Sequence, residues 1–243
     1  MSLKLPDIEL VWASDDTIKR RLAEEGFNKD GILRDITHSD RITHVYEGGL
    51  PGILCALRGA AHITLHDYNE YVIRCFTEEN LCLNGVDKSK YCLRSGPWSE
   101  FQSAIQPHYY DVVVTSETIY NTDDYENLHD AFDYALSPTG VIWVAAKVFY
   151  FGVGGNVPTF VEFVESKGVF KVSTKESISS DIPRVPKSIL FFIFALVVGD
   201  LTTMIEFLGC RAGHVSTVGE PPFANGTLLT VEISINPCTS FVF

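Results

Sequence analysis

Polar side chains that could bind a ligand follow a short apolar segment in the middle of the chain. Three consecutive valines at 112–114 predict a strand that is buried on both faces of a parallel sheet. The residues that follow include four side chains able to form hydrogen bonds: Ser116, Glu117, Tyr120 and Asn121. In an open α/β sheet, ligands bind beyond the carboxyl ends of the strands, so these residues are candidates for a site. A structural alternative stays open, because any strand that leaves the core must become polar.

A second candidate group ends an earlier predicted strand. Residues 61–66 alternate as a strand does and are followed by Asp67, Tyr68 and Asn69. An acidic side chain at the end of the second strand is the usual way in which a Rossmann-type domain binds ribose hydroxyls. An aspartate at a strand end is also a common N-cap of the next helix, so the residue type alone leaves both roles open.

Two other patterns carry less information. Residues 152–155 read Gly-Val-Gly-Gly, but no Lys-Ser/Thr pair follows them, so they do not form a phosphate-binding P-loop. His62 and His66 are four residues apart on a predicted strand with no third ligand beside them. We therefore predict no metal site.

The elements that must position these residues alternate along the chain. Before residue 41, a short strand is predicted within 8–13 and a helix over 17–25, capped by Ser14 or Asp15. Further strands are predicted at 61–66, around 112–114, at 91–95 and at 141–146, with helices at 51–59, 71–76, 125–136 and 157–165, a turn at 137–140 and a hairpin from 170. Strand and helix in this rhythm predict an α/β fold with a doubly wound parallel sheet.

Length and composition narrow the class of protein. A chain of 243 residues has one α/β domain as its default. The formal net charge of −12 argues against sequence-independent binding to nucleic acid, which depends on basic side chains. Six cysteines without a C-x-x-C pair predict reduced thiols of an intracellular protein, and residues 1–9 do not resemble a signal peptide. We expect a location in the cytoplasm and the nucleus.

Several separated motifs resemble one family, and they occur in its order. They are Tyr-Glu-Gly-Gly-Leu at 46–50, Asp-Tyr-Asn at 67–69, Gly-Pro-Trp at 96–98, Ser-Glu-Thr-Ile-Tyr-Asn at 116–121 and Tyr-Phe-Gly-Val-Gly-Gly at 150–155. Together they resemble the seven-β-strand S-adenosylmethionine (SAM) methyltransferases that modify proteins, and within that group the histidine protein methyltransferases. The resemblance implies a Rossmann-like class I methyltransferase sheet, SAM as the cofactor and a protein substrate, which in the family is a large-subunit ribosomal protein. We expect a monomer that contacts neither nucleic acid nor a membrane.

The same resemblance implies roles for single residues. The cofactor would be bound by Gly49, Gly52, Asp67, Tyr68, Asn69, Gly96, Pro97, Trp98 and Ser116. Trp98 would stack on the adenine, although a core tryptophan is an equally good interpretation. The 152–155 loop would bring its backbone close to the substrate channel.

Glu117, Tyr120 and Asn121 would line the acceptor pocket as the catalytic group. Methyl transfer is an in-line displacement, so positioning supplies most of the rate. An acceptor histidine needs no strong base, but one ring N–H must be held so that the other nitrogen faces the methyl group. Glu117 is the better candidate for that task, because an ionised carboxylate only accepts hydrogen bonds. A structural role for Glu117 is equally open.

One part of the family pattern has no counterpart in the sequence. In the family, Tyr-Glu-Gly-Gly-Leu is followed by a helix and by the first, central strand, which ends in the glycine turn that contacts SAM. Here Gly49 is followed at once by Leu50-Pro51-Gly52, which resembles the far end of that turn. A strand, a helix and their loops take roughly 25 residues. We therefore expect a sheet that lacks its central first strand.

The sequence suggests three parts: an N-terminal arm at 1–40, an incomplete methyltransferase domain at 41–190, and an unrelated, poorly ordered tail at 191–243. In the family, the last strand begins near residues 188–190. The ten apolar residues at 189–198 are too few for a membrane span, which needs about 20. We expect the tail to form no part of the fold.

The leading functional hypothesis is a SAM-dependent protein-histidine N-methyltransferase whose activity is in doubt, because the glycine turn is incomplete. A non-catalytic isoform or a mis-spliced gene product is the alternative from another class. A protein-lysine methyltransferase of the same group is a second alternative, since only the substrate pocket would differ.

Overall fold

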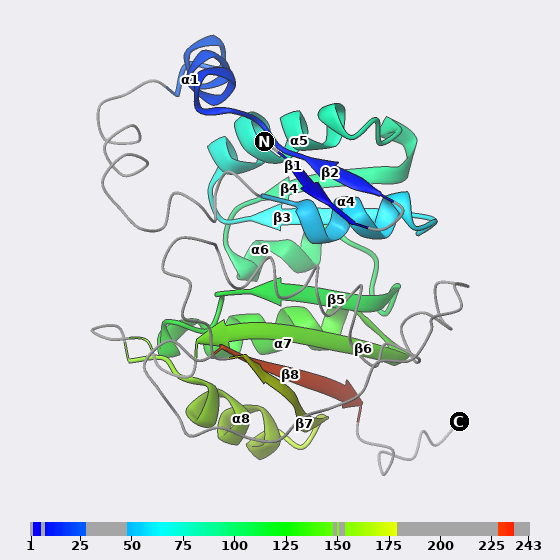
Figure 1. The fold of residues 1–243 in the computed structure, drawn as a ribbon. Helices are drawn as coiled ribbons and strands as arrows, with labels where there is room; N and C mark the ends of the chain where they lie inside the picture. Colours follow the sequence, from blue (N-terminus) through cyan, green and yellow to red (C-terminus); the bar gives the residue numbers. More distant parts are fainter. Residues whose placement is uncertain are drawn as a thin grey trace. The chain divides into compact units, whose positions relative to one another are not determined.

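The computed structural model describes residues 2–5, 8–27, 48–147, 150, 154–178 and 228–235. They fall into two compact units, the first ending at Gly96 and the second beginning at Pro97 (Figure 1). None of the helices within these ranges is long and apolar enough to cross a membrane. Several parts of the expected pattern lie outside the described residues: 28–47, 151–153, 188–198, Cys210 and Cys238.

The first unit holds two small sheets with helices around them. Its elements are β1 (Ser2–Lys4), β2 (Glu9–Val11), α1 (Asp15–Glu24), α4 (Leu50–Leu57), β3 (Ile63–Asp67), the π-helix η1 (Val72–Thr77), α5 (Glu78–Leu83), the 3-10 helix η2 (Lys88–Lys90) and β4 (Tyr91–Ser95). β1 pairs with β2 antiparallel, and β3 pairs with β4 parallel, with Asp67 opposite Ser95 at the carboxyl end. The predicted helix at 71–76 is longer than expected, because η1 continues directly into α5.

The predicted N-terminal arm packs into this unit where it is described. Leu10 is fully buried against a cluster that includes Leu50 and Ile53 of α4. α1 begins at the predicted cap, Ser14, and buries Ile18 against Phe76. The amide groups of residues 11 and 13 donate to the side chains of Asn84 and Asn80, at 3.0 Å each.

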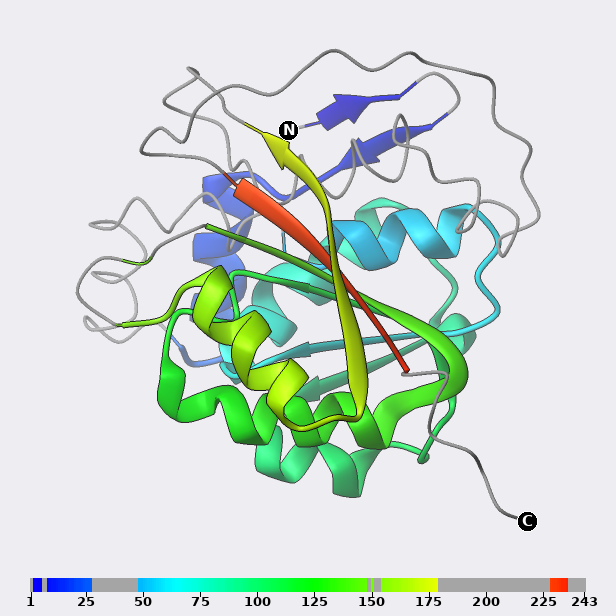
Figure 2. The ribbon, with the colours of Figure 1, turned by 90° about the horizontal axis from the view of Figure 1, so that it is seen from below.

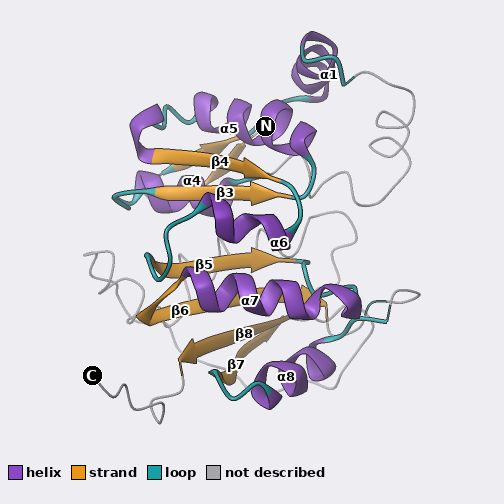
Figure 3. Cartoon of the chain, turned by 180° about the vertical axis from the view of Figure 1, so that it is seen from behind, coloured by secondary structure: helices purple, strands orange, loops and turns teal. Residues whose placement is uncertain are grey.

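The second unit is a four-stranded sheet with helices packed on it (Figures 2 and 3). Its elements are α6 (Trp98–Phe101), the 3-10 helices η3 (Gln102–Ala104) and η4 (Thr122–Asp124), β5 (Tyr110–Ser116), α7 (Tyr125–Ala135), β6 (Leu136–Lys147), α8 (Val157–Ser166), β7 (Phe170–Ile178) and β8 (Leu228–Ile235). The strand order is β5-β6-β8-β7, with β5 parallel to β6 and β8 antiparallel to both of its neighbours.

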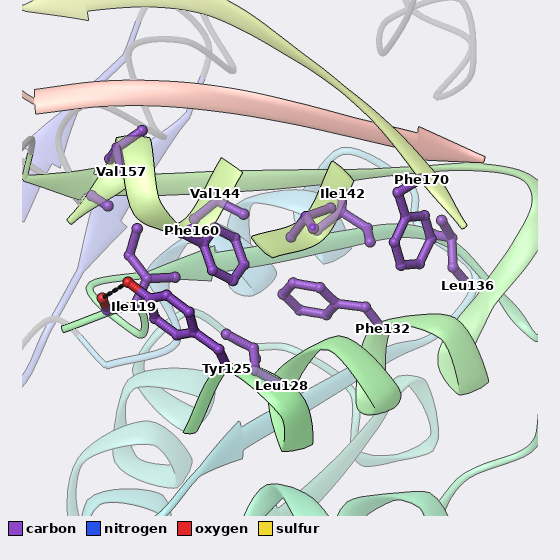
Figure 4. Packing of buried hydrophobic residues seen from close by; sticks show 12 residues of the cluster. Ile119, Tyr125, Leu128, Phe132, Leu136, Ile142, Val144, Val157, Phe160 and Phe170 are labelled. Carbon is purple, nitrogen blue, oxygen red and sulfur yellow. Dashed lines mark hydrogen bonds between the residues drawn. The ribbon is translucent and has the colours of Figure 1, made fainter. Parts of the chain in front are cut away.

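The core of this unit lies between the sheet and the helices α7 and α8 (Figure 4). Alternate residues of β6, Ile142 and Val144, are fully buried. Leu128 and Phe132, which form the predicted apolar stripe of α7, pack into the same cluster as Phe160 of α8. The period-2 pattern of the strand and the 3.6-residue pattern of the helices thus meet on one face of the sheet.

The α/β class and the parallel pairing are confirmed, but the burial of the valine strand is not as predicted. Val112, Val113 and Val114 lie in β5, and each of them keeps part of its surface exposed. Among the described residues, β5 pairs with β6 alone and is an edge strand. An edge strand lacks a neighbour on one side, which explains the incomplete burial.

The expectation that the tail takes no part in the fold was wrong for residues 228–235. They form β8, which lies between β6 and β7 and pairs with both. In this register Ile233 lies opposite Ile142 and Val231 lies opposite Val144. The boundaries at residues 40 and 190 stay predictions.

The predicted turn at 137–140 is also different in the structure. β6 already begins at Leu136, which lies opposite Tyr110, and the ladder resumes with Val141 opposite Val112. The extra residues on β6 form a register irregularity within the strand, as in a bulge. Gly140 is required there, because a Cβ atom would lie 2.9 Å from the carbonyl oxygen of Asp111.

Candidate functional site

In the first unit, the candidate residues gather at the carboxyl end of the parallel pair β3–β4. Oδ1 of Asp67 accepts hydrogen bonds from the backbone N–H of Asn69, at 2.7 Å, and from its side-chain amide, at 3.4 Å. The carbonyl oxygen of Asp67 accepts from the N–H of Gly96 at 3.2 Å. The structure thus brings these three residues together.

Only one carboxylate oxygen of Asp67, Oδ1, accepts hydrogen bonds within the described part of the chain. Burial raises the pKa of its carboxyl group, and the hydrogen bonds from Asn69 lower it in part. Oδ2 has no hydrogen-bond partner within the described part of the chain, so it can still accept a hydroxyl. Tyr68 is 71% exposed and therefore presents its ring to solvent.

The two predicted glycines of the cofactor turn have structural tasks in α4. Gly49 is the N-cap of α4 with φ +82°, a left-handed conformation that favours glycine. Gly52 packs on β3, where a Cβ atom would lie 2.5 Å from Cδ2 of Leu65. Helix packing alone is enough to account for both glycines, and a cofactor role for them stays a prediction.

In the second unit, the chain turns sharply where β5 ends. Glu117 has φ +57°, which is uncommon for a residue with a side chain, and its N–H donates to the carbonyl oxygen of Ala145 at 2.9 Å. The hydroxyl of Thr115 donates to that of Thr118 at 2.9 Å. Oγ of Ser116 is buried without a hydrogen-bond partner among the described residues. Unfavourable backbone conformations of this kind persist where surrounding contacts enforce them, and they are common at functional sites.

Tyr120 and Asn121 differ in what their side chains leave available. Tyr120 is 45% exposed. The side chain of Asn121 accepts from the N–H of Asp123 and donates to Asp124, both at 3.1 Å, and so caps η4. The capping role favours a structural task for Asn121, while Tyr120 remains free to meet a ligand.

The described part of the glycine-rich segment, Gly154 and Gly155, lies directly against this loop. The N–H of Gly155 donates to the carbonyl oxygen of Tyr120 at 2.9 Å, and Gly154 forms a β-bridge with Asn121. A Cβ atom at position 155 would lie 2.1 Å from the carbonyl oxygen of Ile119, so only glycine fits. The rings of Tyr120 and Tyr150 meet edge to face with centroids 6.3 Å apart. A close backbone approach therefore occurs at Gly155, against the candidate acceptor loop, while the expected approach to a substrate channel stays a prediction.

The second unit starts within the Gly-Pro-Trp segment, at Pro97. Pro97 is the N-cap of α6, and Trp98 packs against the hydrophobic cluster of α7 and α8. The indole also meets the ring of Phe101 edge to face, with centroids 6.1 Å apart. These contacts favour the core interpretation of Trp98, while adenine stacking stays a prediction.

One contributor to the loop was not identified from the sequence. The hydroxyl of Tyr125 lies between the carbonyl oxygen of Ile119 and the backbone of Asn156. The sequence signal that could have found it is a tyrosine at the first turn of an amphipathic helix, directly after the motif at 116–121.

Comparison with known proteins finds similar sequences in one group. Residues 37–150 match the family described as "Lysine methyltransferase". The chain is 37% identical to the histidine protein methyltransferase 1 homolog of Mus musculus over 163 positions, which cover 56% of this chain and 45% of that protein. It is related to the histidine protein methyltransferases.

Other relatives carry the same name. The homolog of Dictyostelium discoideum is 33% identical over 137 positions, which cover 56% of this chain and 44% of that protein. The homolog of Bos taurus is 30% identical over 244 positions, which cover 74% of this chain and 65% of that protein. The chain thus spans about half the length of the first two relatives.

The mouse alignment also bears on the missing strand. It spans 163 positions but uses 56% of the 243 residues, about 136, so about 27 positions of the mouse protein have no counterpart here. A strand and a helix with their loops take roughly 25 residues. The size of the difference fits the loss of one strand–helix unit.

Proposed function

We propose that this chain is a SAM-dependent protein-histidine N-methyltransferase scaffold that binds its cofactor weakly. The observation that supports it is the loop at 116–121, in which a left-handed Glu117 is fixed by Ala145 and the neighbouring backbone by Gly155. This loop carries one of the motifs by which the sequence resembles the histidine protein methyltransferases. Its conformation is defined by close contacts, as an acceptor pocket requires.

The residues present fit one part of SAM better than the other. Oδ2 of Asp67 is available for a ribose hydroxyl, as in other Rossmann-like domains. Gly49 and Gly52 instead start α4 and pack on Leu65, and no described strand ends at them. The described residues therefore supply no backbone cradle for the methionine end of the cofactor, which is why we expect weak binding.

For the acceptor, the chain supplies orientation rather than a strong base. SAM supplies an electrophilic methyl group when it is bound. A histidine side chain with an ordinary pKa near 6.5 is largely uncharged at neutral pH. In our proposal the Glu117 carboxylate accepts the N–H of one imidazole nitrogen, which leaves the lone pair of the other free to attack. After transfer, the same carboxylate faces the newly cationic ring and stabilises it.

Substrate, partners and location belong to the proposal as well. We propose a large-subunit ribosomal protein as the substrate, on the basis of the family, with no direct contact to nucleic acid. The formal net charge of −12 suits a basic protein partner. We further propose a monomer in the cytoplasm and the nucleus.

Two other functions compete with this one. The description of the matched family names lysine as the methylated residue. A lysine methyltransferase of this group would differ from a histidine methyltransferase only in the acceptor pocket. A non-catalytic isoform is favoured by the structural tasks of Gly49 and Gly52, and by the absence of a strand that ends at Gly49 among the described residues.

Calorimetry of SAM binding tests the first step, and micromolar affinity would overturn the expectation of weak binding. Transfer of a radiolabelled methyl group to large-subunit ribosomal proteins, followed by hydrolysis, then separates the candidates. Methylhistidine supports the proposal and methyllysine supports the second function. No labelled residue, even at millimolar SAM, supports the non-catalytic isoform.

A further inference from the structure

The hydroxyl group of Tyr125 joins two loops of the second unit. Tyr125 is the first residue of α7, is 3% exposed, and has its ring among the buried residues of the core (Figure 4). The hydroxyl donates to the carbonyl oxygen of Ile119 at 3.2 Å, with the carbonyl oxygen of Asn156 as an alternative acceptor at 3.3 Å. It also accepts the N–H of Asn156 at 3.2 Å. One side chain therefore satisfies backbone groups of both segments.

The two segments are those of the candidate acceptor site. Ile119 is buried in the loop after β5, and Asn156 is the N-cap of α8, directly after the glycine-rich segment. Next to the Tyr125 hydroxyl, Gly155 donates to Tyr120 at 2.9 Å, and Tyr150 donates to Gly155 at 3.1 Å. The backbone that carries the Tyr120 and Tyr150 rings thus adjoins the atoms that Tyr125 holds.

The Tyr125 hydroxyl group can keep its hydrogen bonds to both segments. Burial raises the pKa of Tyr125, so the group stays a neutral phenol that both donates and accepts. The ring is anchored independently of the hydroxyl, because it meets the rings of Phe160 and Phe163 with centroids 5.0 and 5.6 Å apart. Removal of the oxygen alone would leave the packing in place.

We propose that Tyr125 is a positioning residue of the acceptor site: its hydroxyl holds residues 119–121 against 154–156 and so orients the exposed ring of Tyr120. It touches neither cofactor nor acceptor and acts through the backbone. The role rests on the proposed function of this loop, but the coupling between Tyr125 and Tyr120 can be measured without any activity.

The test compares Tyr125→Phe with Tyr134→Phe in the full chain. Tyr134 lies on the same helix, and its hydroxyl makes no hydrogen bond within the described part of the chain. Protein labelled with fluorotyrosine reports the Tyr120 ring by fluorine NMR, with the signal assigned from Tyr120→Phe. Amide exchange followed by NMR reports Gly155 and Asn156. We expect Tyr125→Phe to shift or broaden the Tyr120 signal and to speed exchange at Asn156 about tenfold, the effect of one lost hydrogen bond. Tyr134→Phe should change neither.

Each result decides the proposal. An unchanged Tyr120 signal in Tyr125→Phe overturns it, even with faster exchange at Asn156, because the hydroxyl would then serve only the start of α8. If the wild-type chain transfers methyl groups, Tyr125→Phe should lower kcat/KM for the protein acceptor and leave KM for SAM unchanged. If the wild-type chain transfers none, the proposed function fails, while the NMR result still decides the coupling.

Discussion

At the residue scale, the candidate side chains separate by what the fold already uses. The amide of Asn121 caps η4 and the glycines of α4 serve packing, whereas Oδ2 of Asp67 and the ring of Tyr120 stay available. A motif identifies residue types, but it does not tell whether a polar atom is satisfied within its own turn. Three-dimensional contacts decide that, which is why the sequence predicted more site residues than the structure leaves open.

Asp67→Asn should increase the free energy of unfolding at pH 7. Burial raises the pKa of Asp67 in the folded chain, so the folded state binds its proton more tightly than the unfolded state. Its contribution is therefore most favourable below the unfolded pKa and is lost as the pH rises through the folded pKa. Asparagine carries no charge and still accepts from Asn69. Urea denaturation at pH 7 and in acid should show a gain that disappears in acid.

Asp87→Asn is the matched control, with the opposite sign. Asp87 is exposed, and hydrogen bonds from Ser89 lower its pKa, so its contribution is present above the unfolded pKa and is lost in acid. Asp87→Asn should therefore reduce stability at pH 7. Equal effects of Asp67→Asn at both pH values would show that the buried charge carries no cost.

Glu117 can be examined through a pair of variants that both remove its carboxylate. Its φ of +57° disfavours any residue with a Cβ atom, so Glu117→Gly should be more stable than Glu117→Ala by about 1 kcal/mol. Denaturant midpoints of the two variants give the difference. Both should lose acceptor methylation if Glu117 orients the imidazole. A more stable alanine variant would mean that the backbone leaves the left-handed region at little cost.

At the element scale, the contact between Gly155 and the loop after β5 requires that residue 155 has no side chain. Gly155→Ala places a Cβ atom 2.1 Å from a backbone oxygen, so backbone must move, and we expect a loss of at least about 3 kcal/mol. Gly154→Ala is the neighbouring control, since that Cβ would meet nothing within 4 Å and only φ +85° opposes it. Thermal melts should show about 1 kcal/mol for the control. Similar losses for both would contradict the close approach.

Elements with strong local patterns were predicted within a few residues. The apolar stripe of α7 and the valines of β5 each identify an element from neighbouring residues alone. β8 was missed although residues 230–235 alternate polar and apolar side chains, because its partners lie far away in the sequence. The resemblance stops before this segment, and long-range pairing left no local mark other than that alternation.

At the scale of the whole molecule, each unit holds one parallel pair of strands. Among the described residues, β3 pairs with β4 alone and β5 with β6 alone, so each pair leaves an edge at which the family would have a neighbour. The predicted cofactor residues Asp67 and Ser116 come from different units. The predicted cofactor residues are therefore divided between the two units, and SAM binding by this chain stays a proposal.

The contribution of the tail gives a final prediction, which reverses what the sequence suggested. Truncation after Leu190 removes β8, and with it the strand that pairs with both β6 and β7. Ile142 and Val144 of β6 are fully buried, and the loss of their strand neighbour exposes an apolar edge that favours aggregation. We expect the truncated chain to melt at least several degrees lower and to precipitate sooner. Val231→Pro, placed in the middle of β8, should cost about 1–3 kcal/mol, because proline removes a ladder hydrogen bond and leaves the partner group unsatisfied. Truncation after Ile235 keeps β8 and is the control. If the chain cut after Leu190 melts at the temperature of the full chain, β8 contributes nothing to stability.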